Sequence, residues 1–388
     1  MFRKFTHLAI LFSLVTLGVT EGWGSEYDAL ARRSLRNAGS NRAEISKALR
    51  LVPRKQQEGM EFLIAFMPVS DLQSLSAQFL LQHVKYAYKA WQESAWSDSI
   101  SKDIFLNNIL PYSNVTETRE SWRKDFYERF QVIVRDSKTP GEAAVKLNQE
   151  IFKITNVKYS TARKRPDQSP SETIDSGLAS CSGLSVMLID ACRSVGIPAR
   201  FVGTPMWSNK SGNHSWVEIW NDGWHFTGAC EPAGDQLDRG WFLGRASQAD
   251  RNSRLHAIYA VSYRPTKQRF PLGWADEKDW VWAVNVTDRY TQMKEELPAG
   301  MARVMFSAID SDGTRLSAAV EIRDTAGNLI YEGTTNDIRF DTNDHLNVKL
   351  KLSEQYEILV RHDTVSIRRS VKFETTGVLT LFKFKANK

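Results

Sequence analysis

Residues 177–185 read GLASCSGLS, and the cysteine at their centre, Cys181, decides how the rest of the sequence is interpreted. Small or polar residues surround it, whereas a core cysteine has apolar neighbours and a cysteine in a disulfide bond needs a partner cysteine. The chain has an odd number of cysteines, which leaves at least one unpaired in an exported protein: Cys181, Cys192 and Cys230. The pattern favours a reactive thiol at Cys181.

A helix is expected to begin at Cys181. Apolar residues recur after it at helical spacing, and Gly196 with Pro198 ends the run. The unpaired N–H groups and the dipole of a first helical turn stabilise a thiolate. Cys192 lies eleven residues further on, so it is ~16 Å from Cys181 and cannot form a disulfide bond with it. We expect Cys192 in the core, and a bond between Cys192 and Cys230 is left open.

Three strands are expected after this helix, at residues 199–203 (ARFVG), 214–220 (HSWVEIW) and 224–228 (WHFTG). The last two are joined by NDG, a compact hairpin turn. His214 therefore stands at the head of a strand. A thiol becomes a good nucleophile when a base takes its proton, and histidine is the usual base near neutral pH.

Together these segments resemble the transglutaminase-like superfamily of papain-like thiol enzymes, in its exported bacterial type. The resemblance rests on Gly177 with CSG at 181–183, on GIPARFV at 196–202, on the His214 strand and on the Trp224 strand. It covers roughly residues 140–235. It implies Cys181 as the nucleophile and His214 as the general base and acid, attacking an amide or acyl carbonyl to give a thioester.

The sequence departs from the family pattern at one place. The family has an aspartate four residues after the strand tryptophan, whereas this chain has Gly228 there. Either Glu231, followed by Pro232, replaces the aspartate across a bulge, or the acid is absent and a backbone carbonyl or an amide orients His214. We favour Glu231. The oxyanion is expected to be bound by the N–H of Cys181 and, by analogy with papain-like enzymes, by Gln168.

Two further assignments concern the surroundings of the site. Trp207 lies in the loop that leads to His214 and is the candidate for a wall of the cleft. His225, Cys230 and the catalytic pair do not have the spacing of a zinc site, so no metal and no cofactor are expected.

The flanking regions differ in pattern. We expect a helical N-terminal region at 25–139, a transglutaminase-like core at 140–295 and an all-β sandwich at 300–388, similar to prealbumin-like or carboxypeptidase-regulatory-like modules. One helix is expected to open at Ser70, which has capping-box spacing with Gln73, and residues 160–176 are expected to form a loop. The fold class is therefore α+β.

Residues 1–24 have the three parts of a secretory signal peptide: a basic start, an apolar stretch from Leu8 to Val19, and small and polar residues. We therefore expect a secreted or periplasmic protein. No later stretch has the ~18 apolar residues of a membrane span, so stable membrane insertion is not expected.

The amino-acid composition limits the classes of binding partner that are expected. The 388 residues are 42% hydrophobic and 25% charged, typical of a globular protein of two or three domains. The net charge of +6 is a mild excess without a nucleic-acid motif. The expected partners are peptide, protein or cell-wall glycopeptide substrates. The sequence does not distinguish hydrolysis of an amide from cross-linking of proteins. The alternative function is a transglutaminase-like binding module that has lost catalysis.

Overall fold

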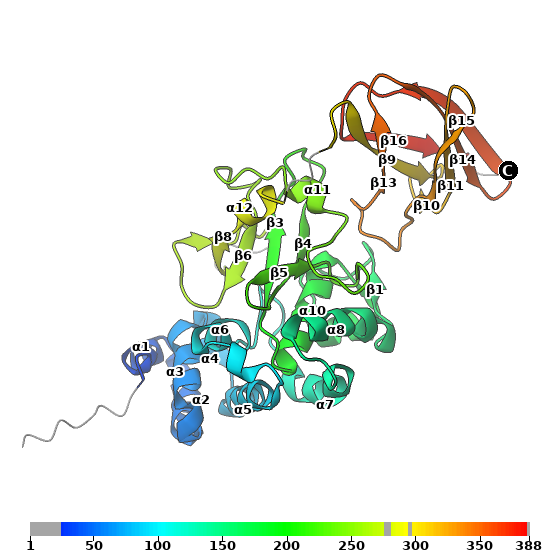
Figure 1. Cartoon of the computed structure of the whole chain (residues 1–388). Helices are drawn as coiled ribbons and strands as arrows, with labels where there is room; N and C mark the ends of the chain where they lie inside the picture. Colours follow the sequence, from blue (N-terminus) through cyan, green and yellow to red (C-terminus); the bar gives the residue numbers. More distant parts are fainter. Residues whose placement is uncertain (1–24, 275–280, 294–296, 386–388) are drawn as a thin grey trace, which may run out of the picture.

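The computed structural model describes residues 25–274, 281–293 and 297–385, so the predicted signal peptide at 1–24 lies outside the described residues. Helices fill one end of the molecule, a six-stranded sheet stands above them, and a β-sandwich forms the other end (Figure 1). This is the α+β arrangement that the sequence predicts, with a helical N-terminal region and a C-terminal region of strands. Within the described ranges, no helix is both long and apolar enough to cross a membrane.

The helical region and the helices of the core follow one another along the chain. The α-helices are α1 (Asp28–Ser34), α2 (Arg42–Leu51), α3 (Gln57–Phe66), α4 (Val69–Ser74), α5 (Ala77–Glu93), α6 (Lys102–Asn108), α7 (Trp122–Val134), α8 (Pro140–Ile154), α9 (Pro170–Ser176), α10 (Cys181–Ser194), α11 (Leu243–Ala246) and α12 (Thr287–Thr291). Short 3-10 helices are η1 (Leu35–Asn37), η2 (Gly39–Asn41), η3 (Arg54–Gln56) and η4 (Ser97–Ser99).

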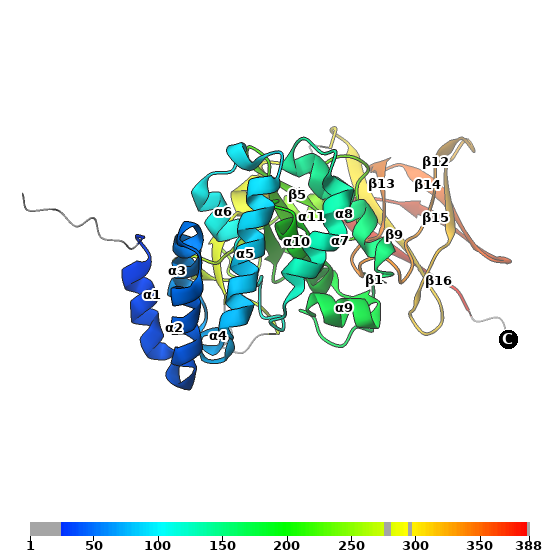
Figure 2. The same ribbon diagram turned by 90° about the horizontal axis from the view of Figure 1, so that it is seen from below.

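Helix α10 is the centre of the core. It packs against α5, α7 and α8 on one side and against β3 and β4 on the other, as Figure 2 shows from below. All its residues from Ser182 to Ser194 are buried, which fits a helix whose apolar residues are spread around its circumference. Gly196 ends it in a left-handed conformation, with φ of 82°. A Cβ atom there would lie 2.5 Å from the carbonyl oxygen of Ala90, so only glycine fits.

The six-stranded sheet is antiparallel, in the order β5-β4-β3-β6-β8-β7. Its strands are β3 (Ala199–Thr204), β4 (His214–Trp220), β5 (Trp224–Thr227), β6 (Tyr259–Ser262), β7 (Gln268–Arg269) and β8 (Trp282–Asn285). The three strands expected at 199–228 are present, and the predicted NDG turn joins β4 to β5. Asp222 in this turn has φ of 57°, as a tight hairpin requires.

Two local predictions were wrong. The helix expected to open at Ser70 is two helices, α4 and α5, and the second begins after Ser76, whose side chain accepts a hydrogen bond from the N–H of Phe79. The segment 160–176 is not a loop throughout, because it contains α9. Ser169 and Glu172 cap that helix reciprocally, and Pro170 occupies its first turn, so the proline read as a loop signal starts a helix.

The helical region and the core share one cluster of buried side chains, which runs from Tyr27 to Ala283. Parallel strands β1 (Lys158–Tyr159) and β2 (Leu178–Ala179) lie just before α10 and bring Tyr159 towards its start. The boundaries proposed at 139/140 and 295/300 stay predictions.

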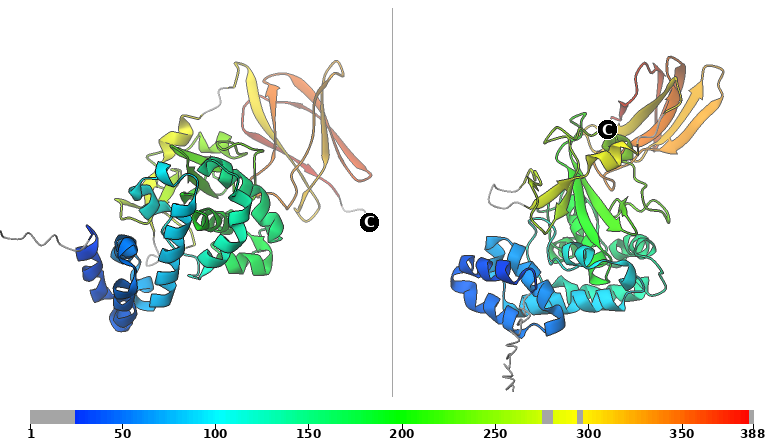
Figure 3. Two further views of the ribbon diagram at one scale, coloured as in Figure 1. Left: turned by 60° about the horizontal axis from the view of Figure 1, so that its bottom comes forward. Right: turned by 60° about the vertical axis from the view of Figure 1, so that its left-hand side comes forward.

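The C-terminal strands form two four-stranded sheets around a separate apolar cluster (Figure 3). One contains β9 (Met301–Ile309), β10 (Arg315–Leu316), β13 (Leu346–Lys351) and β16 (Val378–Lys383); the other contains β11 (Ala319–Asp324), β12 (Leu329–Thr334), β14 (Gln355–His362) and β15 (Val365–Lys372). Alternate residues of β9, β11 and β14 point into the core between the sheets. Sequence alone did not reveal β10, which has two residues, or β12 and β15, most of whose residues are exposed.

Candidate active site

Cys181 is the first residue of α10, as the sequence predicts, and its thiol is free and partly exposed. Helix geometry leaves the first N–H groups of α10 without intrahelical acceptors, so they face the region of the thiol. The hydroxyl of Ser180 donates to the carbonyl of Pro166 and fixes the chain before the helix. The hydroxyls of Ser182 and Ser215 lie 3.0 Å apart and join α10 to β4 beside both Cys181 and His214.

His214 is the first residue of β4, and its side chain is almost completely buried. Its imidazole lies among aromatic rings, with centroid distances of 4.8 Å to Trp241 and 4.9 Å to Phe242. Trp216 lies behind these rings, and its indole N–H donates to Tyr290, which in turn donates to the buried carboxylate of Glu218. This packing holds the ring in one orientation.

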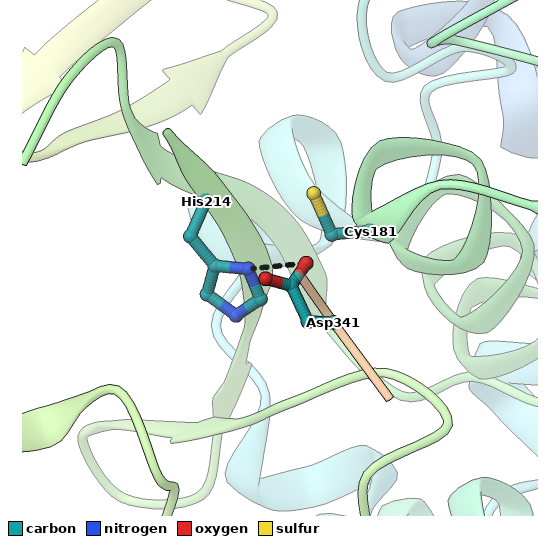
Figure 4. Close-up of side chains that lie close together, drawn as sticks. All are labelled: Cys181, His214 and Asp341. Carbon is teal, nitrogen blue, oxygen red and sulfur yellow. Dashed lines mark ion pairs between the residues drawn. The ribbon is translucent and has the colours of Figure 1, made fainter. Parts of the chain in front are cut away.

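The structure adds an acid that the sequence analysis missed. Asp341, in the segment between β12 and β13, is buried, and its Oδ2 lies 3.5 Å from Nδ1 of His214. The sulfur of Cys181, a ring nitrogen of His214 and a carboxylate oxygen of Asp341 all lie within 4.8 Å of one another. In Figure 4, the nitrogen paired with Asp341 is on the side of the ring turned towards the sulfur. No sequence signal marks Asp341, because it belongs to a different sheet region and is brought to the site only by the fold.

Glu231 lies on the other side of the ring. Its Oε2 is 3.9 Å from Nε2 of His214 and accepts a 2.8 Å hydrogen bond from the indole of Trp241, a second residue that the sequence analysis missed. A Cβ atom on Gly228 would lie only 2.6 Å from the same Oε2. The Glu231 carboxylate therefore occupies the space that a side chain at position 228 would fill.

The chain reaches this arrangement through a tight turn after β5. Cys230 adopts φ of 64°, and Glu231 returns to pair with Gly228. Asn148 of α8 holds the turn: its amide donates to the carbonyl of Gly228 at 2.8 Å and accepts from the N–H of Cys230 at 2.9 Å. The extra residues between Trp224 and Glu231 are thus absorbed as a turn.

The pKa values of His214 and Glu231 are both raised, although burial acts on the two side chains with opposite sign. Burial lowers the pKa of His214, but Asp341 and Cys181 together outweigh it and hold that pKa well above its ordinary value. Burial raises the pKa of Glu231 to about 7, with the Asp341 charge adding to the rise and the charge of His214 opposing it. Neither ring nitrogen of His214 has a hydrogen-bond partner among the described residues, so the two carboxylates act on it as near charges.

Two sequence assignments are wrong in this structure. Gln168 is buried, and its amide N–H groups are directed to the carbonyl oxygens of Glu172 and Leu178 and to the hydroxyl of Ser176, so they are not available to an oxyanion. Trp207 is buried and stacks on Trp216 with an interplanar angle of 6°, so it supports His214 from behind and is not a cleft wall.

The other two cysteines are free thiols, so Cys192 and Cys230 form no bond with each other. Cys192 is fully buried, as predicted, and burial raises its pKa. Burial, with the charge of Glu231, raises the pKa of the Cys230 thiol to about 12. These thiols therefore stay protonated at neutral pH.

The segment that carries Asp341 is anchored to the core beside the thiol. The hydroxyl of Tyr159 accepts from the N–H of Thr342 at 3.1 Å and lies 2.9 Å from its hydroxyl. The side chain of Asn343 donates to the carbonyl of Asn213, next to His214. A cavity of about 480 Å³, lined in part by Phe66, Arg119 and Tyr263, lies apart from the site and shares none of its residues.

One family model matches part of the chain. Residues 128–229 match the model of the transglutaminase-like superfamily, a segment that includes Cys181 and His214 and ends before Glu231 and Asp341. This segment is a transglutaminase-like domain. No curated protein matches the chain.

Similar solved structures include a candidate cysteine protease from Cytophaga hutchinsonii and red sea bream transglutaminase. The first is 17% identical, with a TM-score of 0.28, and the match covers 47% of this chain and 63% of that chain. The second is 8% identical, with a TM-score of 0.30, and the match covers 73% of this chain and 66% of that chain. The chain therefore spans just under two thirds of each of these structures.

Proposed function

We propose that the protein is an exported, cysteine-dependent amide hydrolase or acyl transferase that acts on peptide or glycopeptide amides. One observation carries the proposal: Cys181, at the start of a buried helix, lies with a buried histidine and a carboxylate within 4.8 Å of one another. A nucleophile close to a base is the minimum that thiol catalysis requires, and a third group orients the base. The export assignment rests on the sequence of residues 1–24 alone.

The reaction divides into two steps. The thiolate sulfur of Cys181 attacks the carbonyl carbon of the substrate amide, and the tetrahedral oxyanion is stabilised by the N–H of Cys181 at the first turn of α10. His214 then gives its proton to the leaving nitrogen, the C–N bond breaks and a thioester remains. Water or an amine next attacks the thioester while His214 takes its proton, and the thiol leaves with a carboxylic acid or a new amide as product.

Glu231 is the orienting acid in this proposal. It approaches Nε2, whereas Nδ1 faces both Asp341 and the side of the thiol, and its carboxylate fills the space of the side chain that Gly228 lacks. Whether the acceptor is water or an amine depends on what reaches the thioester, so both reactions belong to one proposal.

The first experiment labels the folded protein with iodoacetamide between pH 4 and 9 and maps the adducts to each cysteine by mass spectrometry. Cys181 should react at neutral pH faster than an unfolded thiol, and His214→Ala should remove the excess rate. Cys230→Ser is the matched control, because Cys230 is a partly exposed thiol of the same core with a raised pKa. A Cys181 that labels no faster than an unfolded thiol would contradict the enzyme.

A second experiment incubates the protein with peptide and glycopeptide amides, with and without a primary amine, and follows release and transfer by mass spectrometry. Products that disappear in Cys181→Ser support the proposal, and transfer to the amine identifies an acyl transferase. The alternative function, a binding module without catalysis, predicts retained ligands and no products in either condition.

A further inference from the structure

The three reactive groups of the site also have the composition of a metal site. A thiolate, an imidazole and a carboxylate are a ligand set suited to zinc, since sulfur and imidazole select borderline transition metals over calcium or magnesium. Among the described residues, Cys181, His214 and Asp341 are a group whose ligand atoms lie within 4.8 Å of one another, and each comes from a different element.

The distances are close to what a tetrahedral ion requires. Zinc bonds of about 2.0–2.3 Å place neighbouring ligand atoms roughly 3.3–3.8 Å apart. The 3.5 Å between Nδ1 of His214 and Oδ2 of Asp341 already fits. The sulfur of Cys181 needs to approach by about 1 Å at most on the same reckoning, a movement that rotation about its Cα–Cβ bond supplies.

The burial and hydrogen bonding of His214 suit a metal ligand. His214 is almost fully buried, yet neither of its ring nitrogens has a hydrogen-bond partner among the described residues. A buried polar group without a partner is costly, and an ion bound at Nδ1 would satisfy it. Nε2 would then keep its proton, facing Oε2 of Glu231 at 3.9 Å in the carboxylate–histidine–metal arrangement that fixes the tautomer of ligand histidines.

Asp341 has its own support. Its Oδ1 accepts the N–H of Asn343 at 2.9 Å, which leaves Oδ2 free to face His214. Two arginines, Arg245 and Arg315, lie near Asp341 and the neighbouring Asp344. The cluster itself bears two negative charges when the thiol is ionised and the imidazole neutral, and one divalent cation compensates both.

We propose that Cys181, His214 and Asp341 bind one divalent cation of the zinc class, with water at the fourth position. The proposal needs only these ligand atoms, so it holds or fails independently of amide chemistry. Its consequence for the proposed function is that a bound ion occupies the thiolate and Nδ1 and reversibly blocks the nucleophile. Loss of the thiol proton on binding makes the affinity rise with pH.

Cobalt is the probe, because a thiolate bound to Co²⁺ gives a charge-transfer absorption band that other ligands do not. When Co²⁺ is added to the reduced full-length mature chain, the absorbance of this band should rise until one equivalent has been added. Adding Zn²⁺ should then abolish the band by displacing the cobalt. Cys181→Ser should remove the band, and Asp341→Asn should weaken binding by at least about 10-fold. Asp238→Asn, which disturbs the partly buried His225–Asp238 pair, is the matched control and should bind as wild type does.

Zn²⁺ should also protect Cys181, but not Cys230, from iodoacetamide. The proposal is overturned if the band is absent, if it persists in Cys181→Ser, or if Asp341→Asn binds as tightly as Asp238→Asn. Circular dichroism of each variant separates loss of ligands from loss of fold. A protein that binds cobalt but cleaves no amide contradicts only the proposed function, and one that cleaves amides without binding cobalt contradicts only the metal site.

Discussion

The imidazole of His214 lies between two carboxylates that approach different nitrogens. Asp341 is 3.5 Å from Nδ1, and Glu231 is 3.9 Å from Nε2. Because Nδ1 is also on the side of the thiol, Asp341 and Cys181 compete for the same proton, whereas Glu231 orients the ring from behind. The two acids therefore have different effects when they are removed.

Asp341→Asn should lower the pKa of His214. Burial already disfavours the charged imidazole, and the variant removes the main group that opposes burial, so a fall of about 1–3 units is expected. A raised histidine pKa stabilises the fold below the unfolded value of about 6.5, and this contribution is lost as pH rises through the raised folded value. Between these two pKa values the free energy of unfolding of the wild type falls as pH rises, and in the variant this fall should be smaller or absent. NMR titration of the His214 ring measures the shift, with His225 as the internal control; an unchanged pKa would contradict the pairing.

Glu231→Ala should reduce kcat/KM by at least about 100-fold, because the histidine loses its orienting acid. Adding Gly228→Asp to this variant should restore at least part of the loss, since the vacated space begins at the Cβ of residue 228. Gly228→Asp alone is the control and should be impaired, because its Cβ would lie 2.6 Å from the Glu231 carboxylate. If the double variant is no better than Glu231→Ala, Glu231 does not replace an acid at position 228.

The sequence leads to Cys181, His214 and Glu231 because they lie within one continuous pattern of helix, strand and strand. Asp341 could not be found in this way, since an acidic residue in a polar turn of a β-sandwich looks like any surface residue. Gln168 was misassigned for a related reason: chain position does not show where an amide points, and here it caps local carbonyl groups.

Helix α10 positions the nucleophile of the site, and the sequence predicts both of its ends. Its apolar residues and Gly196 predict where it runs and ends. The start of α5 and the presence of α9 were harder to predict. Serine is a residue type that favours N-caps, so Ser70 and Ser76 look alike in the sequence although only Ser76 caps a helix, and Pro170 fits a loop as well as a first helical turn.

Gly196→Ala should destabilise the fold by about 2–4 kcal/mol, since alanine meets both a left-handed backbone and a clash with the carbonyl of Ala90. Gly234→Ala is the matched control. Gly234 has φ of 66°, but no atom lies within 4 Å of its added Cβ, so only the backbone cost of about 1–2 kcal/mol remains. Urea unfolding followed by tryptophan fluorescence compares the two, and equal losses would mean that the contact with Ala90 is not limiting.

At the scale of the whole molecule, the C-terminal sandwich and the thiol domain meet at the active site. The sandwich has its own apolar core, yet it contributes Asp341 to a cluster whose other members belong to the sheet and α10. The alternating strands predict the sandwich from sequence, but the packing of two separately cored units depends on surface contacts that leave no periodic signal.

Tyr159 is the contact that tests this junction. Tyr159→Phe removes the hydroxyl that bonds Thr342, next to Asp341, while keeping the ring. Hydrogen–deuterium exchange should rise at residues 340–345 and stay unchanged in α10, because each lost hydrogen bond contributes only about 1 kcal/mol. Tyr86→Phe, on α5 away from the junction, is the matched control. Unchanged exchange at 340–345 would show that the Tyr159 hydroxyl does not hold this segment, which would leave the Asn343–Asn213 contact and the bonds from Arg315 to the carbonyl groups of Phe340 and Asp344 to position it.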